Sequence, residues 1–478
     1  MWASSSGPAS TRGSAGIRAR RSGRSTMNDT LANRRVIVMG LGRFGGGVGV
    51  TRWLARNGAR VLVTDQATEG ELADSVRQLE GLPLGWRLGG HDPADLDVCD
   101  LLVVSPAVDK ARSEFFQAAR RRGIPWTSEM NLFLERCPAR LVGITGTAGK
   151  STTTAMTGSI LQAAAAGGGL NGRRVFVGGN IGRSLLDDLS VMRAEDVVVL
   201  EMSSFQLEDA AEVRRSPSIA LLTNLRENHL DRHGTMDAYA DAKLNIVRFQ
   251  SHSDVAFVHE LETDLRRRLD ALRPRSSVRE FGDQATLTAL IDILRVPGRH
   301  NRDNAAGALA IAGELGVGRD EAFRALRGFS GLPHRLEFVA ERDGVRYYND
   351  SKSTTPESAR IALEAFDEPV VMLLGGYDKH VSFDGLGTAV AARARAAICY
   401  GAVREQIAAS VLSADGSARV ECVDDLPSAV AAARRVARSG DIVLLSPGCA
   451  SYDQFRNYEQ RGDVFRALVC DVADSLRS

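Results

Sequence analysis

The chain has 478 residues, of which 44% are hydrophobic and 25% are charged, and its formal net charge is +1. This length corresponds to about three domains of ~150 residues, and the composition is that of an ordinary globular protein. The balanced charge gives no bulk electrostatic basis for binding nucleic acid or an anionic membrane, so we expect neither as a partner. No apolar run approaches the ~20 residues that a membrane-spanning helix needs.

The cysteines indicate the redox environment of the protein, and the first 26 residues differ in composition from the rest of the chain. The six cysteines are scattered without a C-x-x-C pair, which fits a reducing compartment and argues against a disulfide framework or a zinc site. Residues 1–26 carry five Arg, no Asp or Glu and many Ser and Gly, without the continuous apolar run of a secretory signal. We interpret them as a disordered tail, or as the product of an upstream start codon with Met27 as the real start.

Short apolar, β-branched runs alternate with helical patterns along the rest of the chain. Continuous apolar strands that alternate with helices are typical of parallel sheets covered on both faces. The sequence therefore predicts an α/β protein, and Gly- and Pro-containing breaks divide it into domains at 27–137, 138–331 and 332–478. The expected strands form three series, 35–40, 60–65 and 101–106, then 140–146, 196–204, 218–224 and 254–258, and finally 369–376, 394–401, 418–423 and 441–448.

A glycine-rich stretch after the strand at 140–146 is typical of a phosphate-binding loop. Its glycines let backbone N–H groups face phosphate oxygens, and the following helix adds partial positive charge. Lys150 is expected to reach the β- and γ-phosphates, and Ser151 or Thr152 to offer a hydroxyl to Mg²⁺. The standard G-x-x-x-x-G-K-[ST] spacing would require Gly where Ile144 stands. The loop comprises Gly146, Thr147, Ala148, Gly149, Lys150, Ser151 and Thr152.

Polar residues also follow the next two strands, at the sheet edge where ligands of parallel sheets bind. Glu201 at a strand end suits Mg²⁺, which prefers hard oxygen ligands. By residue type alone, His229 is more often a hydrogen-bonding residue than a ligand, and Lys243 on a helix is more often a solvated charge.

The first domain contains a pattern with a second interpretation. Gly40, Gly42 and Gly45 follow a strand with G-x-G-x-x-G spacing, and Asp65 ends the next strand. Taken alone, this arrangement indicates a dinucleotide site and an NAD-dependent oxidoreductase.

Nine segments in order give the chain a resemblance to the Mur ligases, extending from about residue 34 to 470. The resemblance is strongest to the D-glutamate-adding members, and the shortened phosphate loop is a trait of the family. The segments are GITGTAGKST (143–152), GGNIG (178–182), EMSSFQLE (201–208), NHLDRHGTMDAYADAK (228–243), PGRHNRDN (297–304), GLPHRLE (331–337), NDSKSTTPES (349–358), LLGGYDK (373–379) and LLSPGCASYDQFRNYEQRG (444–462).

This resemblance implies a fold and a reaction. It implies Rossmann-like first and third domains, which bind the UDP-sugar and the amino acid, around a P-loop ATPase-like central domain with a mostly parallel sheet. ATP would convert the carboxylate of UDP-N-acetylmuramoyl-L-alanine into an acyl phosphate. The amine of D-glutamate would then attack through a tetrahedral intermediate, in a cytoplasmic step of peptidoglycan precursor synthesis. The family leads us to expect a monomer that uses ATP and two Mg²⁺.

The resemblance also implies roles for individual residues around ATP. Lys150 would hold the β- and γ-phosphates, while Ser151 and Glu201 would ligate one Mg²⁺. His229 and Lys243 would serve the second Mg²⁺, Lys243 as a carbamate formed with CO₂. Other ATP contacts would come from Gly146, Thr147, Ala148, Gly149, Thr152, Asn301, Asn304, Arg335 and Asp350.

The two remaining substrates are assigned in the same way. The UDP-sugar would contact Gly42, Arg43, Phe44, Asp65, Ser105, Asn180 and Ser203. D-Glutamate, with two carboxylates, needs cationic and hydroxyl donors, and these would be Lys352, Thr354, Lys379, Ser451, Tyr452 and Tyr458.

Three departures from the family pattern leave alternatives open. Ala148 stands where Asn is frequent, Ser353-Thr-Thr replaces the more familiar Ala-Thr-Asn, and Tyr458 stands where Phe is common. The last two lie where the amino acid is selected, so a Mur-type ligase for a different amino acid is the nearest alternative. An NAD-dependent oxidoreductase and a non-catalytic nucleotide-binding scaffold are the alternatives from other classes.

Overall fold

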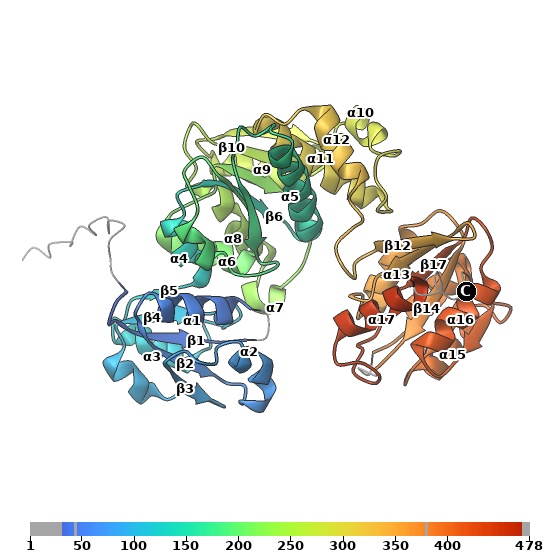
Figure 1. Cartoon of the computed structure of the whole chain (residues 1–478), viewed down its shortest axis with the longest axis horizontal. Coiled ribbons are helices and arrows are strands. Elements are labelled where there is room, and N and C mark those ends of the chain that lie inside the picture. Colours follow the sequence, from blue (N-terminus) through green and yellow to red (C-terminus); the bar gives the residue numbers. More distant parts are fainter. Residues whose placement is uncertain (1–30, 43–44, 378–380, 471–478) are drawn as a thin grey trace, which may run out of the picture.

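The computed structural model describes residues 31–42, 45–377 and 381–470, which form three α/β domains in chain order (Figure 1). The predicted α/β class and three-domain architecture are confirmed. The predicted tail at 1–26 and the candidate residues Arg43, Phe44 and Lys379 lie outside the described residues.

The first domain contains a parallel sheet in the order β3-β2-β1-β4-β5. β1 lies in the middle because its apolar residues are buried on both faces of the sheet. The elements are β1 (Arg35–Met39), α1 (Gly46–Arg56), β2 (Arg60–Asp65), η1 (Gly70–Leu72), α2 (Ala73–Arg77), β3 (Leu84–Leu88), η2 (Pro93–Val98), β4 (Leu101–Val104), α3 (Glu114–Arg121), β5 (Trp126–Thr127) and α4 (Glu129–Arg136).

The central domain contains a parallel sheet in the order β11-β10-β9-β6-β8-β7. The phosphate loop follows β6, which lies between β9 and β8, so the segments after all three strands meet at one edge. The elements are β6 (Arg140–Thr145), α5 (Lys150–Ala166), β7 (Val175–Gly179), η3 (Leu186–Ser190), β8 (Val197–Glu201), α6 (Ser204–Val213), β9 (Ile219–Leu222), α7 (Leu230–His233), α8 (Met236–Arg248), β10 (Val255–His259), α9 (Thr263–Leu272), β11 (Ser277–Phe281), α10 (Gln284–Ala289), α11 (Arg299–Glu314) and α12 (Arg319–Arg327).

The third domain contains a mixed sheet in the order β12-β13-β17-β14-β15-β16, in which only β12 pairs antiparallel. The elements are β12 (Glu337–Arg342), β13 (Val345–Asn349), α13 (Pro356–Glu364), β14 (Val370–Gly375), α14 (Asp384–Arg393), β15 (Ala394–Tyr400), α15 (Arg404–Ala414), β16 (Val420–Cys422), α16 (Leu426–Val436), β17 (Ile442–Leu445) and α17 (Tyr458–Cys470).

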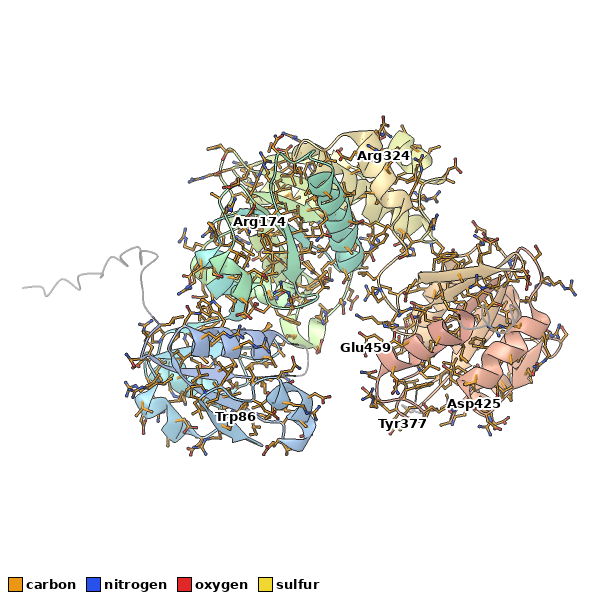
Figure 2. All side chains as sticks on the ribbon, viewed as in Figure 1. Trp86, Arg174, Arg324, Tyr377, Asp425 and Glu459 are labelled. Atoms are coloured by element: carbon orange, nitrogen blue, oxygen red, sulfur yellow. The ribbon has the colours of Figure 1, made fainter. Side chains whose placement is uncertain are left out.

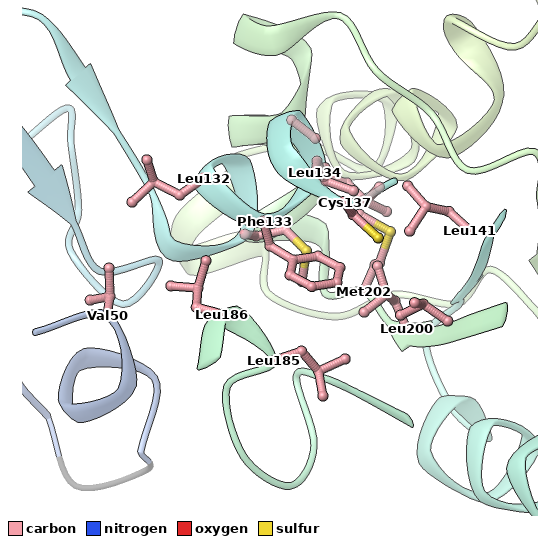
Figure 3. Close-up of a cluster of buried hydrophobic side chains, with 14 of the residues drawn as sticks. Val50, Leu132, Phe133, Leu134, Cys137, Leu141, Leu185, Leu186, Leu200 and Met202 are labelled. Carbon is pink, nitrogen blue, oxygen red and sulfur yellow. The ribbon is translucent and has the colours of Figure 1, made fainter. Parts of the chain in front are cut away.

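The first and central domains share one hydrophobic core, and α4 joins them. Figure 3 shows Phe133 and Leu134 of α4 beside Leu200 and Met202 from the end of β8 and the segment after it. These side chains are buried, so burying their apolar surface stabilises the contact between the two domains. The first and central domains therefore pack together as one unit.

The third domain depends on a fully buried arginine, Arg461 of α17. Its guanidinium donates to the carbonyls of Cys449 and Ala450 at 3.1 and 3.2 Å, and to the hydroxyl and carbonyl of Ser351 at 2.9 and 2.8 Å. Arg461 thus holds together the segments that follow β13 and β17, where the predicted amino-acid contacts lie.

We expect Arg461→Met to lower the free energy of unfolding of the third domain by ~3 kcal/mol, because buried carbonyls lose their donors. Amide hydrogen exchange in β17 measures this value. Arg466→Met on the same helix is the control, since Arg466 is partly exposed in its ion pairs with Glu337 and Asp463 and should cost under ~1 kcal/mol. Equal losses in the two variants would contradict a specific role for Arg461.

Candidate functional site

The phosphate loop can form only with glycine at two positions. Gly146 has φ +150° and Gly149 has φ +82°, and a Cβ atom at Gly146 would lie 1.8 Å from Thr223 Oγ1. A Cβ atom at Gly149 would lie 2.2 Å from Asn304 Oδ1. Left-handed backbone and close approach both require glycine here. The loop therefore packs directly against the segment after β9 and against α11.

The segment after β9 binds the loop through the backbone of Ala148. Asn224 accepts a hydrogen bond from the Ala148 N–H at 2.9 Å and donates to its carbonyl at 3.1 Å, and the Thr223 hydroxyl donates to that carbonyl at 2.7 Å. Because the contacts use the backbone of Ala148, its methyl side chain is compatible with the loop. This explains how Ala148 can stand where Asn is frequent in the family.

Two lysines share one acceptor beneath the loop. The Gly146 carbonyl accepts hydrogen bonds from Lys150 Nζ at 3.0 Å and from Lys243 Nζ at 2.8 Å, and Lys150 also donates to the Thr147 carbonyl at 2.9 Å. Lys243 is buried, contrary to the solvated position that its residue type alone favours. The structure therefore concentrates positive charge under the predicted phosphate site.

This crowding changes the protonation of both lysines. Burial, followed by the charge of Lys150, lowers the pKa of Lys243 to about 7, while Glu201 opposes the shift. The pKa of Lys150 is also lowered, first by burial, with Glu201 opposing and the charge of Arg335 contributing. Near neutral pH, Lys243 is thus partly a neutral amine, whereas an ordinary lysine is almost fully protonated.

Glu201 at the end of β8 fits a cation. Its side chain is buried, Oε1 accepts a hydrogen bond from Asn180 Nδ2 at 2.9 Å, and Oε2 has no hydrogen-bond partner. A buried carboxylate oxygen without a partner is costly unless something binds it. Across the described residues, no three His, Cys, Asp or Glu side chains converge as a metal-binding group.

His229 is placed by an unusual backbone conformation at the start of α7. Its φ is +54°, in the left-handed region that residues other than glycine rarely adopt. Its ring lies 5.2 Å from that of Phe205 and 6.3 Å from that of Tyr239. Burial, followed by the charge of Lys243, lowers the pKa of His229, which favours the neutral imidazole that can ligate a metal.

A cavity of about 370 Å³ extends from the phosphate loop to the third domain. It brings together Asn301 and Asn304 of α11 with Arg335 and Asp350 of the third domain, four residues whose contact with ATP stays a prediction. Asn304 also has a structural task, because it accepts from the Thr153 hydroxyl at 3.2 Å and donates to Asn301 Oδ1 at 3.2 Å. Other residues that line this cavity are Ala148, Gly149, Thr152, His300, Lys352 and Ser353.

Asp350 is a buried acid at the third-domain wall of this cavity. It accepts hydrogen bonds from the hydroxyls of Ser353 at 2.5 Å and Ser446 at 2.7 Å, and from the Leu336 N–H at 3.1 Å. Burial raises the pKa of Asp350 to about 6, although these hydrogen bonds act in the opposite direction. The carboxylate is therefore mostly ionised at neutral pH and fixed in place.

A second cavity of about 310 Å³ lies between the first and central domains. It brings together Gly42, Ser105, Asn180 and Ser203, four of the residues predicted to contact the UDP-sugar. Asp65 does not line it. Its carboxylate accepts from the N–H groups of Gly42 at 3.1 Å and Ala67 at 2.9 Å, so it shapes the loop beside the cavity.

Glu129 and Ser184 also line this second cavity, although the sequence did not indicate a role for either residue. Ser184 donates a hydrogen bond to Glu129 at 2.5 Å, and burial raises the pKa of Glu129. No motif signals this pair, because the two residues lie on different segments that meet only in the fold. Asn224 and Tyr239 were also missed as site residues, although both lie within or beside recognisable motifs.

The predicted amino-acid contacts gather on the third domain. The Lys352 ammonium lies 5.5 Å from the centre of the Tyr458 ring, and burial lowers the pKa of Lys352. Ser451 is buried, whereas the adjacent Tyr452 is 67% exposed and its ring lies 6.2 Å from that of Tyr377. Figure 2 shows Tyr377 at the rim of this domain. Thr354 follows Lys352 by two residues on the same segment.

We expect Gly149→Ala to weaken ATP binding by at least about tenfold, because the new Cβ displaces Asn304 and distorts the loop. Isothermal titration calorimetry measures the affinity. Gly168→Ala is the matched control, since Gly168 also has φ +82° but open space around it. That variant should retain ATP affinity and lose only ~1 kcal/mol of stability. Unchanged ATP affinity in Gly149→Ala would contradict this description of the loop.

Comparison with protein families gives matches in all three domains. Residues 34–128 match the MurD-like N-terminal domain of Mur ligases, residues 144–290 the Mur ligase middle domain, and residues 334–449 the glutamate ligase domain.

Curated relatives match over nearly the whole chain. Identity is 39% over 470 residues with the UDP-N-acetylmuramoylalanine–D-glutamate ligase of Roseiflexus sp. (strain RS-1), covering 92% of this chain and 99% of that protein. Identity is 38% over 465 residues with the ligase of the same name from Pelotomaculum thermopropionicum, covering 92% and 98%.

Solved structures support the fold. The UDP-N-acetylmuramate–alanine ligase of Thermotoga maritima superposes with a TM-score of 0.56 at 20% identity, covering 91% of this chain and 99% of that chain. The MurF ligase of Thermotoga maritima superposes with a TM-score of 0.51 at 16% identity, covering 93% and 99%. These domain matches replace the dinucleotide interpretation of Gly40, Gly42 and Gly45, and the chain belongs to the Mur ligase family of ATP-dependent ligases.

Proposed function

We propose that this protein uses ATP to join D-glutamate to UDP-N-acetylmuramoyl-L-alanine during peptidoglycan precursor synthesis. The observation that carries the proposal is the phosphate loop, which holds Lys150 and the buried Lys243 on one carbonyl and lines one of the two cavities. Asn180, which donates to Glu201, lines the other cavity. One cavity lies against the first domain and the other reaches the third domain. The curated relatives are named as ligases for the same reaction, which supports the proposal. We further propose that the protein acts as a monomer in the cytoplasm.

The first chemical step makes the carboxylate reactive. A carboxylate is a poor electrophile, so its oxygen attacks the γ-phosphorus of ATP, an O–P bond forms, and the bond to the β-phosphate oxygen breaks to release ADP. The product is an acyl phosphate. Two anions must approach each other in this step, and the charge of Lys150 with the N-terminus of α5 lowers the repulsion.

The proposed nucleotide contacts follow the lining of the 370 Å³ cavity. Lys150 holds the β- and γ-phosphates, and the loop backbone surrounds them. Arg335 and Asp350 contact the nucleotide from the third domain, so movement of that domain would complete or open the site. Asn301 and Asn304 recognise the adenine end.

The donor set fits two magnesium ions. Ser151 and Glu201 would hold one, and His229 with a modified Lys243 would hold the other. Mg²⁺ bound at these residues supplies positive charge that neutralises the phosphate and carboxylate oxygens.

We propose that Lys243 carries a carbamate. Its neutral amine attacks CO₂, an N–C bond forms, and the amine loses a proton to yield an anionic group with two oxygens. The buried position of Lys243 beside Lys150 favours replacing one of two neighbouring positive charges by a negative one. This change also explains how a lysine can belong to a magnesium site.

The second chemical step forms the amide. The amine of D-glutamate attacks the acyl carbon, a tetrahedral intermediate forms, and its collapse breaks the C–O bond and expels phosphate. Cationic and hydroxyl groups of the third domain hold the two carboxylates of the amino acid. The proposed contacts are Lys352, Thr354, Lys379, Ser451, Tyr452 and Tyr458.

The UDP-sugar is proposed to occupy the 310 Å³ cavity. Its diphosphate would lie near the loop after β1, and its lactyl-alanine end would point towards Glu201. The proposed contacts are Gly42, Arg43, Phe44, Asp65, Ser105, Asn180 and Ser203.

The substrate assignment is tested with the full chain, ATP, Mg²⁺, UDP-N-acetylmuramoyl-L-alanine and a panel of amino acids. We expect phosphate release with D-glutamate, because the third domain offers donors for two carboxylates. Release with L-lysine or meso-diaminopimelate but not with D-glutamate would show a Mur-type ligase for another amino acid. Binding of NAD(P)H without binding of ATP would instead support an oxidoreductase.

The carbamate is tested by ¹³C NMR after equilibration with ¹³C-bicarbonate. We expect a carbamate resonance that is absent in Lys243→Ala and retained in Lys352→Ala, the matched control. Because the neutral amine reacts and the pKa of Lys243 is about 7, the neutral fraction and the signal should rise between pH 6 and pH 8. Lys243→Ala should lose activity by about 100-fold or more and regain part of it with added short carboxylic acids. Full activity of this variant would remove the carbamate from the mechanism.

A further inference from the structure

The loop after β4 lines the cavity between the first two domains, yet the central domain holds it in place. Ser105, Pro106 and Ala107 of this loop line the cavity. From α7 of the central domain, Arg232 donates to the Ala107 carbonyl at 3.2 Å and to the Val108 carbonyl. Its guanidinium also lies 3.9 Å from a carboxylate oxygen of Asp109. One arginine therefore binds three consecutive residues across the domain boundary.

The same arginine is connected to His229. Its guanidinium carbon lies 4.9 Å from the centre of the Phe205 ring, and that ring lies 5.2 Å from the ring of His229. Phe205 itself lines the cavity. His229 is the residue before α7, a helix of four residues that contains Arg232, so both belong to one turn of backbone. A shift of the loop after β4 would thus be transmitted to His229 by direct packing.

A buried ion pair fixes the far end of the same loop. Lys110 Nζ lies 2.7 Å from a carboxylate oxygen of Asp209 on α6, with the two side chains 19% and 1% exposed. The Lys110 ammonium also lies 5.4 Å from the centre of the Trp126 ring. The backbone carbonyl of Asp209 accepts from Asn131 Nδ2 of α4 at 2.8 Å. Removing one partner of such an ion pair is destabilising because it leaves an uncompensated charge, so each residue holds the other in place.

We propose that Arg232, supported by the Lys110–Asp209 ion pair, is a positioning residue that couples occupancy of the UDP-sugar cavity to the placement of His229. This inference rests on the proposed function, since it takes that cavity as the sugar-nucleotide site. Substrate seated against Ser105 to Ala107 holds the loop in place, and through Arg232 and Phe205 it holds His229 beside the ATP site. The carboxylate that is to be phosphorylated therefore meets an ordered His229 only when the UDP-sugar that carries it is bound.

The test compares Arg232→Lys with Arg174→Lys in the full chain. Lysine keeps the charge at position 232 but cannot donate to two carbonyls while covering the Phe205 ring. Arg174 is the matched control, since it also contacts an aspartate, Asp196 at 2.6 Å, and a backbone carbonyl, that of Val191. Arg174 directly precedes β7 and lines neither cavity. Asp209→Asn tests the ion pair separately.

We expect Arg232→Lys to raise the KM for the UDP-sugar substrate about tenfold and to lower kcat, with the KM for ATP within about twofold of wild type. Asp209→Asn should raise the same KM by a smaller factor, and Arg174→Lys should change none of these constants. In the free protein, hydrogen exchange of residues 105–112 should become faster in Arg232→Lys and Asp209→Asn only. This measurement needs no substrate and no metal.

Three results would overturn the inference. One is wild-type kinetics and wild-type exchange in Arg232→Lys, and another is the same KM increase in Arg174→Lys, which would indicate general destabilisation. Failure of the proposed function is distinguishable from both, because wild-type protein would then show no binding of UDP-N-acetylmuramoyl-L-alanine by calorimetry. Faster exchange at 105–112 in Arg232→Lys without any change in substrate KM would also reject the coupling.

Discussion

The site depends on one backbone oxygen, the carbonyl of Gly146, which accepts hydrogen bonds from both Lys150 and Lys243. Two ammonium groups on one acceptor, largely removed from water, repel each other and favour any arrangement that brings negative charge near them. The Glu201 carboxylate supplies such charge, and ATP phosphates and the carbamate proposed for Lys243 would add to it. The same crowding explains why burial and neighbouring charge lower the pKa values of both lysines.

The arrangement of the three sheets brings segments of all three domains towards this oxygen. The central sheet places the ends of β6, β8 and β9 side by side, so the phosphate loop, Glu201 and Asn224 meet at one edge. The first domain is joined to that edge through the core around α4 and through the loop after β4. The third domain contributes Arg335 and Asp350 to the nucleotide cavity. Each domain thus supplies a side of the site that the other two lack.

Much of the fold could be predicted from the sequence because buried parallel strands consist of continuous runs of apolar residues. The runs at 140–146 and 196–204 became β6 and β8, and those in the third domain became β14 to β17. The strands that were missed include β3, β7 and β11, which lie at the edges of their sheets, and β3 and β11 are mostly exposed. In β3 and β11 the apolar residues are interrupted by Gly, Arg and Glu, so the continuous apolar run that marks central strands is absent there.

The sequence by itself determined the family, the phosphate loop and the identity of the chemical groups, because nine short motifs of the family occur in order along the chain. Only the tertiary structure decided what each group does to its neighbours. It places Lys243 in a buried position against Gly146, leaves one oxygen of Glu201 without a partner, and uses Asp65 to shape a loop that borders the cavity. It also reveals Glu129, Ser184 and the contact of Arg232 with the loop after β4. Burial and charge at a residue depend on segments far away in the chain, and residue type and local spacing do not encode those distances.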